Sequence, residues 1–248
     1  MLHLFSSCLI AISIISSSYF AQSAVPVTIT DQVPILMYHE IGTPEGPWKS
    51  LYVSENNFRA QIEYLHQNNF NTITMEQLEK NRAGLLNLPE KPIVLSFDDG
   101  YASMYDFVYP LLSEYGMTAT FYIFPEKFGT YNSLTPDQIK KMSDNHMEFG
   151  SHSMSHPDLT RVSEARLHYE IFESKRIIEE ITGHPVTSFC YPAGRYDQKV
   201  ISVLIDAGYL SAVTTKYGKA MTDQHDFELH RIRINYEDSL SAFSRKIE

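Results

Sequence analysis

Apolar residues along the chain follow two alternating patterns. Short, nearly continuous apolar runs, such as Ile-Val-Leu-Ser-Phe at 93–97, are typical of strands buried on both faces. Elsewhere apolar residues recur at helical spacing, as at Phe58, Ile62 and Leu65 after the N-cap residue Ser54. The strands that the first pattern predicts are 34–38, 71–74, 92–97, 119–124, 148–152, 187–191, 211–214 and 229–234.

Further helices are predicted between these strands. They are expected at 101–115, from Thr135 with Pro136 at the first helical position, at 163–181, and at 198–209. Gly116 and Gly183 follow two of them as stop signals. Strands that alternate with helices pair in parallel through right-handed crossovers.

The predicted fold class is therefore α/β, with one domain built as a distorted or incomplete (β/α) barrel. We expect about seven or eight mostly parallel strands in it. An open, doubly wound sheet is the alternative. The Gly-rich dinucleotide fingerprint follows none of the strands, so we expect no nucleotide cofactor.

The first 24 residues carry a pattern of their own. An apolar run at 9–15 lies in a stretch without Asp, Glu, Lys or Arg, and Ala-Gln-Ser-Ala at 21–24 offers the small residues of a cleavage site. This pattern indicates a signal peptide at 1–24, so we expect 25–248 to be an exported domain, periplasmic, at the cell surface or extracellular. An uncleaved membrane anchor is the alternative. Without 1–24 the chain keeps a single cysteine, Cys190, and has no internal disulfide.

The composition narrows the class of partner. The chain of 248 residues has 20 Lys and Arg against 30 Asp and Glu, a formal charge of −10. An acidic chain lacks the basic field that binding to phosphates requires, so we expect no nucleic-acid partner. With 43% hydrophobic and 20% charged residues it has the composition of a folded globular domain. We expect it to be a monomer.

Unusual polar residues follow four of the predicted strands at their C-terminal ends. They are His39, Asp98 with Asp99, His152 with His156, and the segment Tyr191-Pro192-Ala193-Gly194. Because the C-terminal ends of parallel strands meet at one rim, where such folds build their sites, we expect these residues to share one site.

The residue types at this rim predict a metal site. Adjacent carboxylates at Asp98 and Asp99 repel one another unless a cation compensates them, and a simple Asp-Gly turn explains only the second. The spacing of His152 and His156 predicts that both imidazoles lie on one side of a single helical turn. Alone, such a pair is more often an exposed turn. With a carboxylate at the same rim it suits a divalent metal with open positions.

Three segments resemble the motifs of the polysaccharide deacetylases, the family four carbohydrate esterases. They are Ser-Phe-Asp-Asp-Gly-Tyr at 96–101, Ser-His-Ser-Met-Ser-His-Pro at 151–157, and a variant third motif, Phe-Cys-Tyr-Pro-Ala-Gly, at 189–194. The resemblance extends over essentially all of 33–234. It implies a distorted (β/α) barrel and a metal-dependent enzyme that removes N- or O-acetyl groups from glycans.

The resemblance also implies roles for single residues. Asp99, His152 and His156 would hold the metal, Zn²⁺ by preference, with Co²⁺ or another divalent ion as a substitute. Asp98 would be the general base and His39 the general acid. A backbone N–H in the loop of Tyr191, Pro192, Ala193 and Gly194 would stabilise the oxyanion.

The order of the motifs indicates a branch of the family. Most members carry a Leu-x-His motif near the C-terminus, whereas here Pro-Ile-Leu-Met-Tyr-His at 34–39 precedes the aspartates. This order resembles the circularly permuted poly-N-acetylglucosamine deacetylases of biofilm exopolysaccharide systems. It favours poly-β-1,6-N-acetylglucosamine as the substrate, ahead of chitin-type glycans and peptidoglycan. Leu229-His230 fits the C-terminal motif superficially, but 230–233 alternates like an edge strand, so we favour His39 over His230 as the acid.

The sequence departs from the family pattern at two motifs. The third motif has Cys190 where most members have an arginine that orients the base, and Arg195 comes only after the glycine. The fourth motif lacks its Asp and Trp, since 213–217 contains neither. These departures leave the tuning of Asp98 and His39 open. Trp48 is either a sugar platform on a loop or a packing residue.

Other functions remain to be weighed. A glycan-binding protein that keeps the barrel without turnover is the main alternative. A glycoside hydrolase is disfavoured because adjacent residues such as Asp98 and Asp99 seldom span the ~5–9.5 Å between its carboxylates. A serine esterase is disfavoured because no Gly-x-Ser-x-Gly segment occurs.

Overall fold

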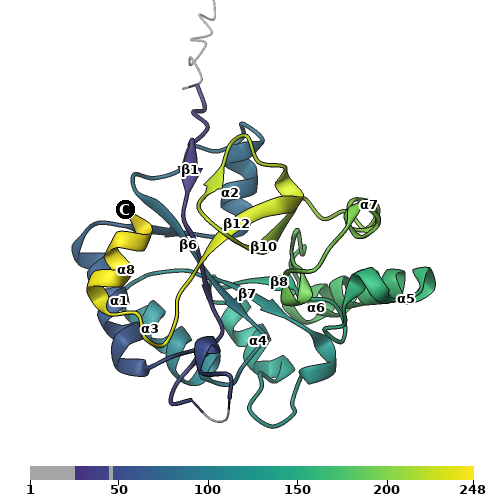
Figure 1. Ribbon diagram of the computed structural model, residues 1–248, viewed down its shortest axis with the longest axis horizontal. Coiled ribbons are helices and arrows are strands. Elements are labelled where there is room, and N and C mark those ends of the chain that lie inside the picture. Colours follow the sequence, from purple (N-terminus) through teal and green to yellow (C-terminus); the bar gives the residue numbers. More distant parts are fainter. Residues whose placement is uncertain (1–25, 45–46) are drawn as a thin grey trace, which may run out of the picture.

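The barrel in the computed structural model is closed and wholly parallel. The structure describes residues 26–44 and 47–248, so the predicted signal peptide at 1–24 lies outside the described residues. Seven strands follow one another in the order β2, β12, β10, β9, β8, β7 and β6, and β6 pairs with β2 to close the ring. Their bounds are β2 Ile35–Tyr38, β6 Pro92–Asp98, β7 Thr120–Ile123, β8 Glu148–Ser151, β9 Ser188–Cys190, β10 Ser211–Tyr217 and β12 Leu229–Arg233. The predicted α/β barrel is confirmed (Figure 1).

An eighth strand, β5 (Asn71–Ile73), stands outside the ring. It pairs in parallel with residues 92–94 of β6, whereas β7 pairs with residues 96–98 of the same strand. Four strands of two residues each were not predicted: β1 Gln32–Val33, β3 Glu40–Ile41, β4 Tyr52–Val53 and β11 Ala220–Met221. They are too short to leave a periodic signal in the sequence.

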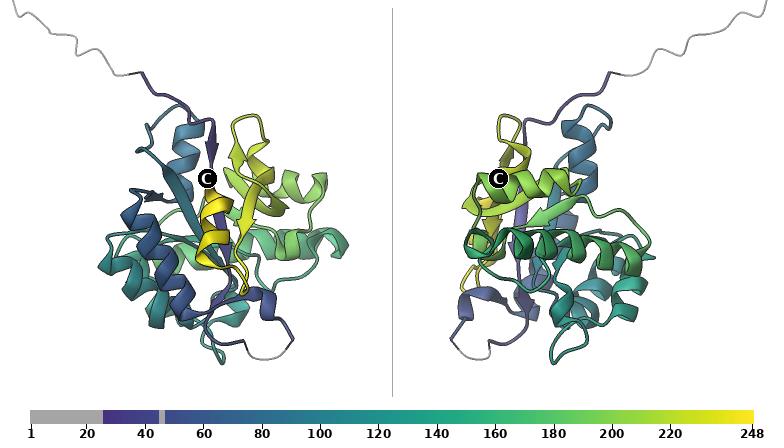
Figure 2. Two further views of the ribbon diagram at one scale, coloured as in Figure 1. Left: turned by 60° about the vertical axis from the view of Figure 1, so that its left-hand side comes forward. Right: turned by 90° about the vertical axis from the view of Figure 1, so that its right-hand side faces the viewer.

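Helices surround the ring of strands (Figure 2). Their bounds are α1 Glu55–Gln67, α2 Met75–Arg82, α3 Tyr109–Glu114, α4 Pro136–Ser143, α5 Glu164–His168, α6 Ser174–Thr182, α7 Gln198–Asp206 and α8 Leu240–Ile247. The predicted caps are confirmed, since the Ser54 hydroxyl accepts from the Asn57 N–H and Gly183 ends α6 with a φ of 75°. No helix in the described part of the chain is both long enough and apolar enough to cross a bilayer.

Two predicted helices each contain a π-helical segment. Met104–Val108 precedes α3, and Tyr169–Glu173 joins α5 to α6 within the predicted helix 163–181. The wider turn inserts one residue into the helical register and is often found beside functional sites. The helical spacing of apolar residues predicted the helices but not this shift of register.

The two ends of the barrel differ in how they are filled. At the N-terminal end, Met75 and Leu78 of α2 join Ile35 and Val94 in the apolar interior, so this helix closes the floor. Further along β6 the interior becomes polar, with Ser96 and Asp98 facing inward. The site therefore lies at the C-terminal end of the strands, away from α2.

The prediction that 230–233 forms an edge strand is wrong. β12 pairs with β10 on one side and with β2 on the other, so barrel closure leaves it no free edge. Alternate residues of an interior strand face the barrel lumen. Arg231 is accordingly buried in the lumen and Arg233 lies at its mouth, among the residues that line the cleft.

Candidate active site

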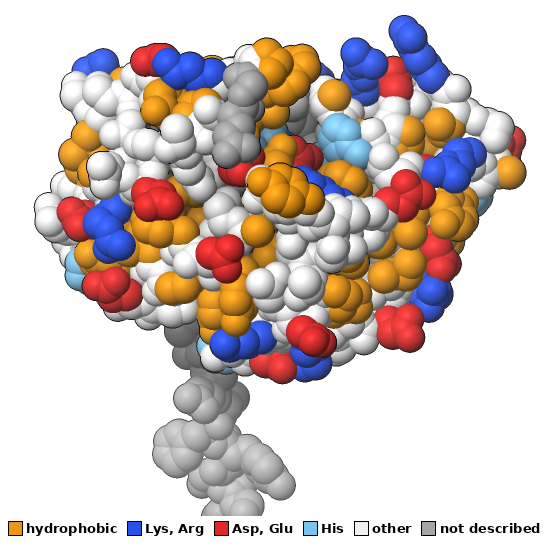
Figure 3. Space-filling view, turned by 90° about the horizontal axis from the view of Figure 1, so that it is seen from below, with side chains coloured by type: hydrophobic (Ala, Val, Ile, Leu, Met, Phe, Trp, Pro, Cys, Tyr) orange, Lys and Arg blue, Asp and Glu red, His pale blue; other side chains and the backbone are white. Residues whose placement is uncertain are grey.

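The C-terminal ends of the strands enclose one cleft of about 640 Å³. His39, Asp98, Asp99, His152 and His156 all line it, so the predicted shared rim is confirmed. Figure 3 looks onto this end and shows acidic and histidine side chains gathered around a hollow, with hydrophobic groups at its border.

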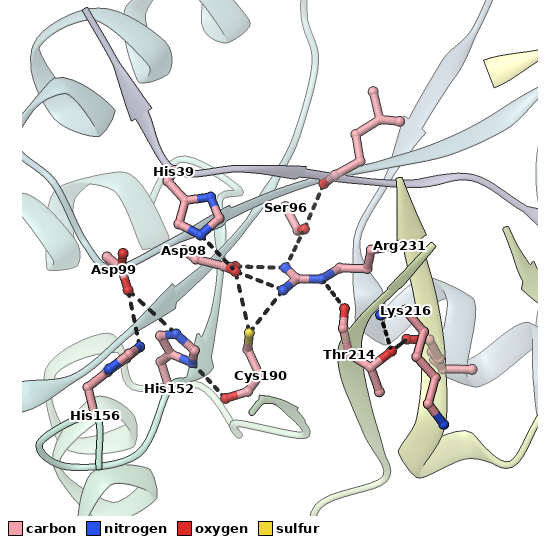
Figure 4. Close-up of polar contacts among 12 residues, drawn as sticks. His39, Ser96, Asp98, Asp99, His152, His156, Cys190, Thr214, Lys216 and Arg231 are labelled. Carbon is pink, nitrogen blue, oxygen red and sulfur yellow. Dashed lines mark hydrogen bonds and ion pairs between the residues drawn. The ribbon is translucent and has the colours of Figure 1, made fainter. Parts of the chain in front are cut away.

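Three side chains converge as a candidate metal centre. An Asp99 carboxylate oxygen, Oδ1, lies 3.5 Å from His152 Nε2 and 3.7 Å from His156 Nε2. The ligand atoms of the three residues all lie within 4.8 Å of one another. The Nδ1–H of His152 donates to the Cys190 carbonyl at 2.6 Å, which turns the Nε2 lone pair towards Asp99 (Figure 4). Two oriented imidazoles and a carboxylate fit a divalent ion with open positions.

The turn that carries the two histidines is not helical, contrary to the prediction. Residues 152–156 form a bend in which Ser153 has a φ of 67° and His156 a φ of 58°. The Ser153 hydroxyl closes the bend by accepting from the His156 N–H at 2.9 Å. The left-handed residues, rather than helical periodicity, bring the two imidazole centroids to 4.7 Å.

A buried carboxylate holds this turn from behind. Glu170, in the π-helical segment Tyr169–Glu173, is fully buried and accepts from the N–H groups of Met154 and Ser155, each at 2.9 Å. It also accepts the Ser155 hydroxyl at 2.6 Å and pairs with Arg166 at 2.7 Å. Neither Glu170 nor Arg166 was singled out from the sequence, because a charged residue on a helix is usually exposed to solvent.

Asp98 is held by an arginine that the sequence analysis missed. The Arg231 guanidinium binds both carboxylate oxygens at 2.7 Å, and its other N–H groups donate to the Thr214 carbonyl and the Ser96 hydroxyl (Figure 4). Burial alone would raise the pKa of Asp98, but the charge and hydrogen bonds of Arg231 outweigh it and lower the pKa to about 2. Asp98 is therefore an ionised, rigidly oriented carboxylate.

Cys190 occupies the place of the missing third-motif arginine and packs against its substitute. The Cys190 sulfur lies 3.2 Å from the Arg231 guanidinium and 3.5 Å from an oxygen of Asp98. The arginine reaches Asp98 from β12 rather than from β9. The sequence did contain a signal for Arg231. Arg231 and Arg233 alternate along one strand, and on a strand with neighbours on both sides such alternation places both side chains on the inner face of the barrel.

His39 is placed beside Asp98, and His230 is not. His39 Nε2 lies 3.9 Å from Asp98 Oδ2, whereas the His230 ring lies against the backbone at Gly218 and does not line the cleft. Burial lowers the pKa of His39 to about 4, against the opposing charges of Asp98 and Asp99. Asp99 stays ionised as well as Asp98. Burial would raise its pKa, but the hydrogen bond and charge of His152 outweigh burial and hold the pKa of Asp99 far below its usual range.

The loop after β9 offers one backbone donor to the cleft. The N–H groups of Tyr191, Gly194 and Arg195 donate within the protein, and Pro192 has none. Ala193, which lines the cleft and has a φ of 52°, supplies the remaining N–H group. Gly194 is required here, because a Cβ would lie 2.1 Å from the Thr215 hydroxyl oxygen.

Trp48 lies at the border of the cleft and is 68% exposed, so it is not a packing residue. An exposed indole at the mouth of a cleft gives a flat apolar surface on which a sugar ring can stack.

Together these features define a hydrolase of the parallel-barrel class, with a candidate metal centre beside an oriented carboxylate. Residues 86–212 match the Polysaccharide deacetylase family. YxkH of Bacillus subtilis, which carries polysaccharide deacetylase in its name, is 33% identical over 217 residues, 88% of this chain and 76% of its own length. The chain belongs to the polysaccharide deacetylase family.

One solved structure and one further relative in sequence are also similar to this chain. The solved structure of the Streptococcus pyogenes deacetylase PplD in complex with acetate superposes with a TM-score of 0.83 at 26% identity, and the match covers 90% of this chain and all of that one, 100%. The poly-β-1,6-N-acetyl-D-glucosamine N-deacetylase of Staphylococcus aureus is 23% identical over 202 residues, 75% of this chain and 69% of its own.

Proposed function

We propose that this deacetylase is a metal-dependent hydrolase that removes N-acetyl groups from an amino-sugar polysaccharide and releases acetate. The observation that carries the proposal is that the acidic and histidine side chains in the cleft fall into two separate sets. Asp99, His152 and His156 face a common point, while Asp98 is kept out of that set by Arg231. Such a site has separate groups for binding a metal and for moving a proton.

The three ligand side chains would hold the metal, Zn²⁺ by preference. A divalent ion there polarises a carbonyl and lowers the pKa of water. Asp98, with both oxygens oriented by Arg231, would accept a proton from the water that attacks the acetyl carbon. The Ala193 N–H would donate to the developing oxyanion.

Collapse of the tetrahedral intermediate breaks the carbon–nitrogen bond. His39 would give a proton to the departing nitrogen, so that a free amine and acetate leave. Because His39 is neutral in the resting cleft, it would first receive the proton that Asp98 took, across the 3.9 Å between them. Water thus supplies the oxygen of the acetate and the proton of the amine.

The order of the motifs makes poly-β-1,6-N-acetylglucosamine the first candidate substrate, followed by chitin-type glycans and peptidoglycan. The name of the Staphylococcus aureus relative supports this candidate. We also propose that residues 1–24 are a signal peptide, that 25–248 are the exported catalytic domain, and that it acts as a monomer without nucleic acid or nucleotide.

Acetate release from these three glycans, with metal analysis of the purified protein, tests the proposal. We expect release by the wild type, its loss on chelation and its return with Zn²⁺ or Co²⁺. Asp98→Asn should keep the metal and lose at least ~10²-fold in kcat, because the base is removed. His39→Ala should also keep the metal and lose most amide hydrolysis, and a fully active variant would contradict its role as the acid.

The main alternative is a glycan-binding protein without turnover. It would bind the same oligosaccharides but release no acetate with any metal. The intact set of base, acid and ligands in one cleft favours the enzyme.

A further inference from the structure

Arg233 has a guanidinium without a partner in the active-site cleft. The other arginines of the described residues each make a side-chain hydrogen bond or an ion pair; they are Arg59, Arg82, Arg161, Arg166, Arg176, Arg195, Arg231 and Arg245. Arg233 makes neither within residues 26–44 and 47–248, although it is half-buried and lines the cleft. A half-buried guanidinium without a partner has N–H donors and a positive charge that a ligand can satisfy.

The strand register fixes where this charge lies. Arg233 follows Arg231 by two residues on β12, so both face the lumen, and Arg233 is one layer nearer the mouth. It pairs in register with Met37 of β2, two residues before His39. The guanidinium therefore lies on the wall of the cleft that carries His39, opposite the histidines of the metal centre.

Nearby carboxylates do not neutralise Arg233. Asp98 is engaged on both oxygens by Arg231, and Asp99 faces His152 and His156. Burial lowers the pKa of Arg233 and the charge of Asp98 raises it, but no carboxylate among the described residues forms an ion pair or a hydrogen bond with the guanidinium. An anionic ligand would supply what the protein does not.

The proposed chemistry places the sugar on this same wall. His39, Trp48 and Arg233 all line this cleft. If His39 protonates the departing nitrogen, the sugar unit that bears it occupies the cleft that Arg233 also lines. We infer that Arg233 is a specificity site for an anionic oxygen group, a carboxylate or a phosphate, on the sugar unit that is deacetylated. This inference rests on the proposed function and narrows its substrate class to acidic glycans.

The inference reverses the order of substrates that the motifs favour. Fully acetylated poly-β-1,6-N-acetylglucosamine and chitin oligomers are uncharged. N-Acetylmuramic acid units carry a lactyl ether on the ring carbon next to the one that bears the acetamide, and its carboxylate is a group that a guanidinium fork binds with two hydrogen bonds. The wall of the cleft thus favours peptidoglycan-type units over neutral glycans.

Kinetics on matched oligosaccharides test the site. The substrates are a chitin tetramer, a tetrasaccharide with N-acetylmuramic acid, its carboxyl-reduced form, and a chitin tetramer bearing phosphate. We expect the wild type to prefer a charged substrate, and Arg233→Gln to raise its KM by roughly 10-fold or more while neutral substrates change less than about 2-fold. Arg233→Lys should be intermediate, and Arg245→Met on α8 is the control for net charge.

The charged substrate that the wild type prefers, the tetrasaccharide with N-acetylmuramic acid or the chitin tetramer bearing phosphate, shows whether Arg233 binds a carboxylate or a phosphate. Equal losses on charged and reduced substrates in Arg233→Gln would overturn the inference, as would a wild type that prefers neutral glycans. Calorimetric binding to the Asp98→Asn protein gives a readout that needs no turnover. Tighter binding of the charged tetrasaccharide than of its reduced form, lost on adding Arg233→Gln, supports the site, and equal binding refutes it. If no glycan yields acetate, the proposed function fails while the binding result still stands.

Discussion

Each end of the barrel holds one buried and one half-buried carboxyl group, and the surroundings shift the pKa values of the two pairs in opposite directions. At the C-terminal end, Asp98 has a pKa lowered to about 2 by the buried Arg231. At the N-terminal end, burial raises the pKa of Glu79 to about 7 and that of Glu148 to about 8. Neither glutamate forms an ion pair with a Lys or Arg of the described residues.

The neighbours explain the difference. Glu148 accepts from the N–H groups of Met75 and Glu76 and so closes the start of α2, and Glu79 accepts the Ser211 hydroxyl at 2.6 Å. These hydrogen bonds join α2 to the N-terminal end of the barrel, and a neutral carboxyl group can make several of them. At the rim the Arg231 guanidinium and the imidazoles keep Asp98 and Asp99 ionised. Burial alone therefore does not mark a functional carboxylate, whereas a buried cation beside it does.

The largest effect is expected from removing the cation at the rim. Arg231→Met leaves Asp98 buried without its counter-charge, so we expect the free energy of unfolding to fall by about 3–5 kcal/mol and kcat to drop by at least ~10²-fold. Urea unfolding and acetate release measure the two effects. The double variant Arg231→Met with Asp98→Asn should recover part of the stability and none of the activity. A stable, active single variant would show that Asp98 does not depend on this charge.

A smaller effect is expected behind the histidine turn. Glu170→Gln weakens the hydrogen bonds that hold Met154 and Ser155, so we expect metal affinity to fall ~10–100-fold. Competition with a chromophoric chelator gives the affinity. Glu173→Gln is the matched control, because this residue lies on the same π-helical segment and its carboxylate bonds only Arg176 among the described residues. The role of Glu170 is refuted if both variants bind the metal equally well.

The smallest effect is expected at the floor and depends on pH. Because the folded state raises the pKa of Glu79, stability from this residue is fully present below about pH 4.5 and is lost as the pH rises through about 7. Glu79→Gln should remove that loss, so its unfolding free energy should gain on the wild type by on the order of 1–2 kcal/mol between pH 5 and pH 8. Urea unfolding across this range, with the exposed Glu76→Gln as control, measures it. A difference that does not change with pH would contradict the raised pKa.

The sequence predicted most of the fold and which side chains converge at the candidate metal centre, for physical reasons. Buried parallel strands such as β6 leave continuous apolar runs, and the polar residues at their ends stand out against them. Long-range geometry leaves no such local trace. Barrel closure gave β12 two neighbours, and only this closure turns Arg231 from a residue on a supposed edge into the partner of Asp98. The left-handed bend at Ser153 was equally invisible to a helical interpretation of the spacing.

The position of β12 has a consequence for how the enzyme is made. The ring closes only when this strand, formed by residues 229–233, enters between β10 and β2, whose residues 35–38 lie near the opposite end of the described chain. We expect closure across such a separation to be slow, because contacts between distant segments of the chain require a long loop to close first. The pairing of the Arg231 guanidinium with Asp98 depends on this closure, so this end of the barrel is complete only when the whole ring has formed.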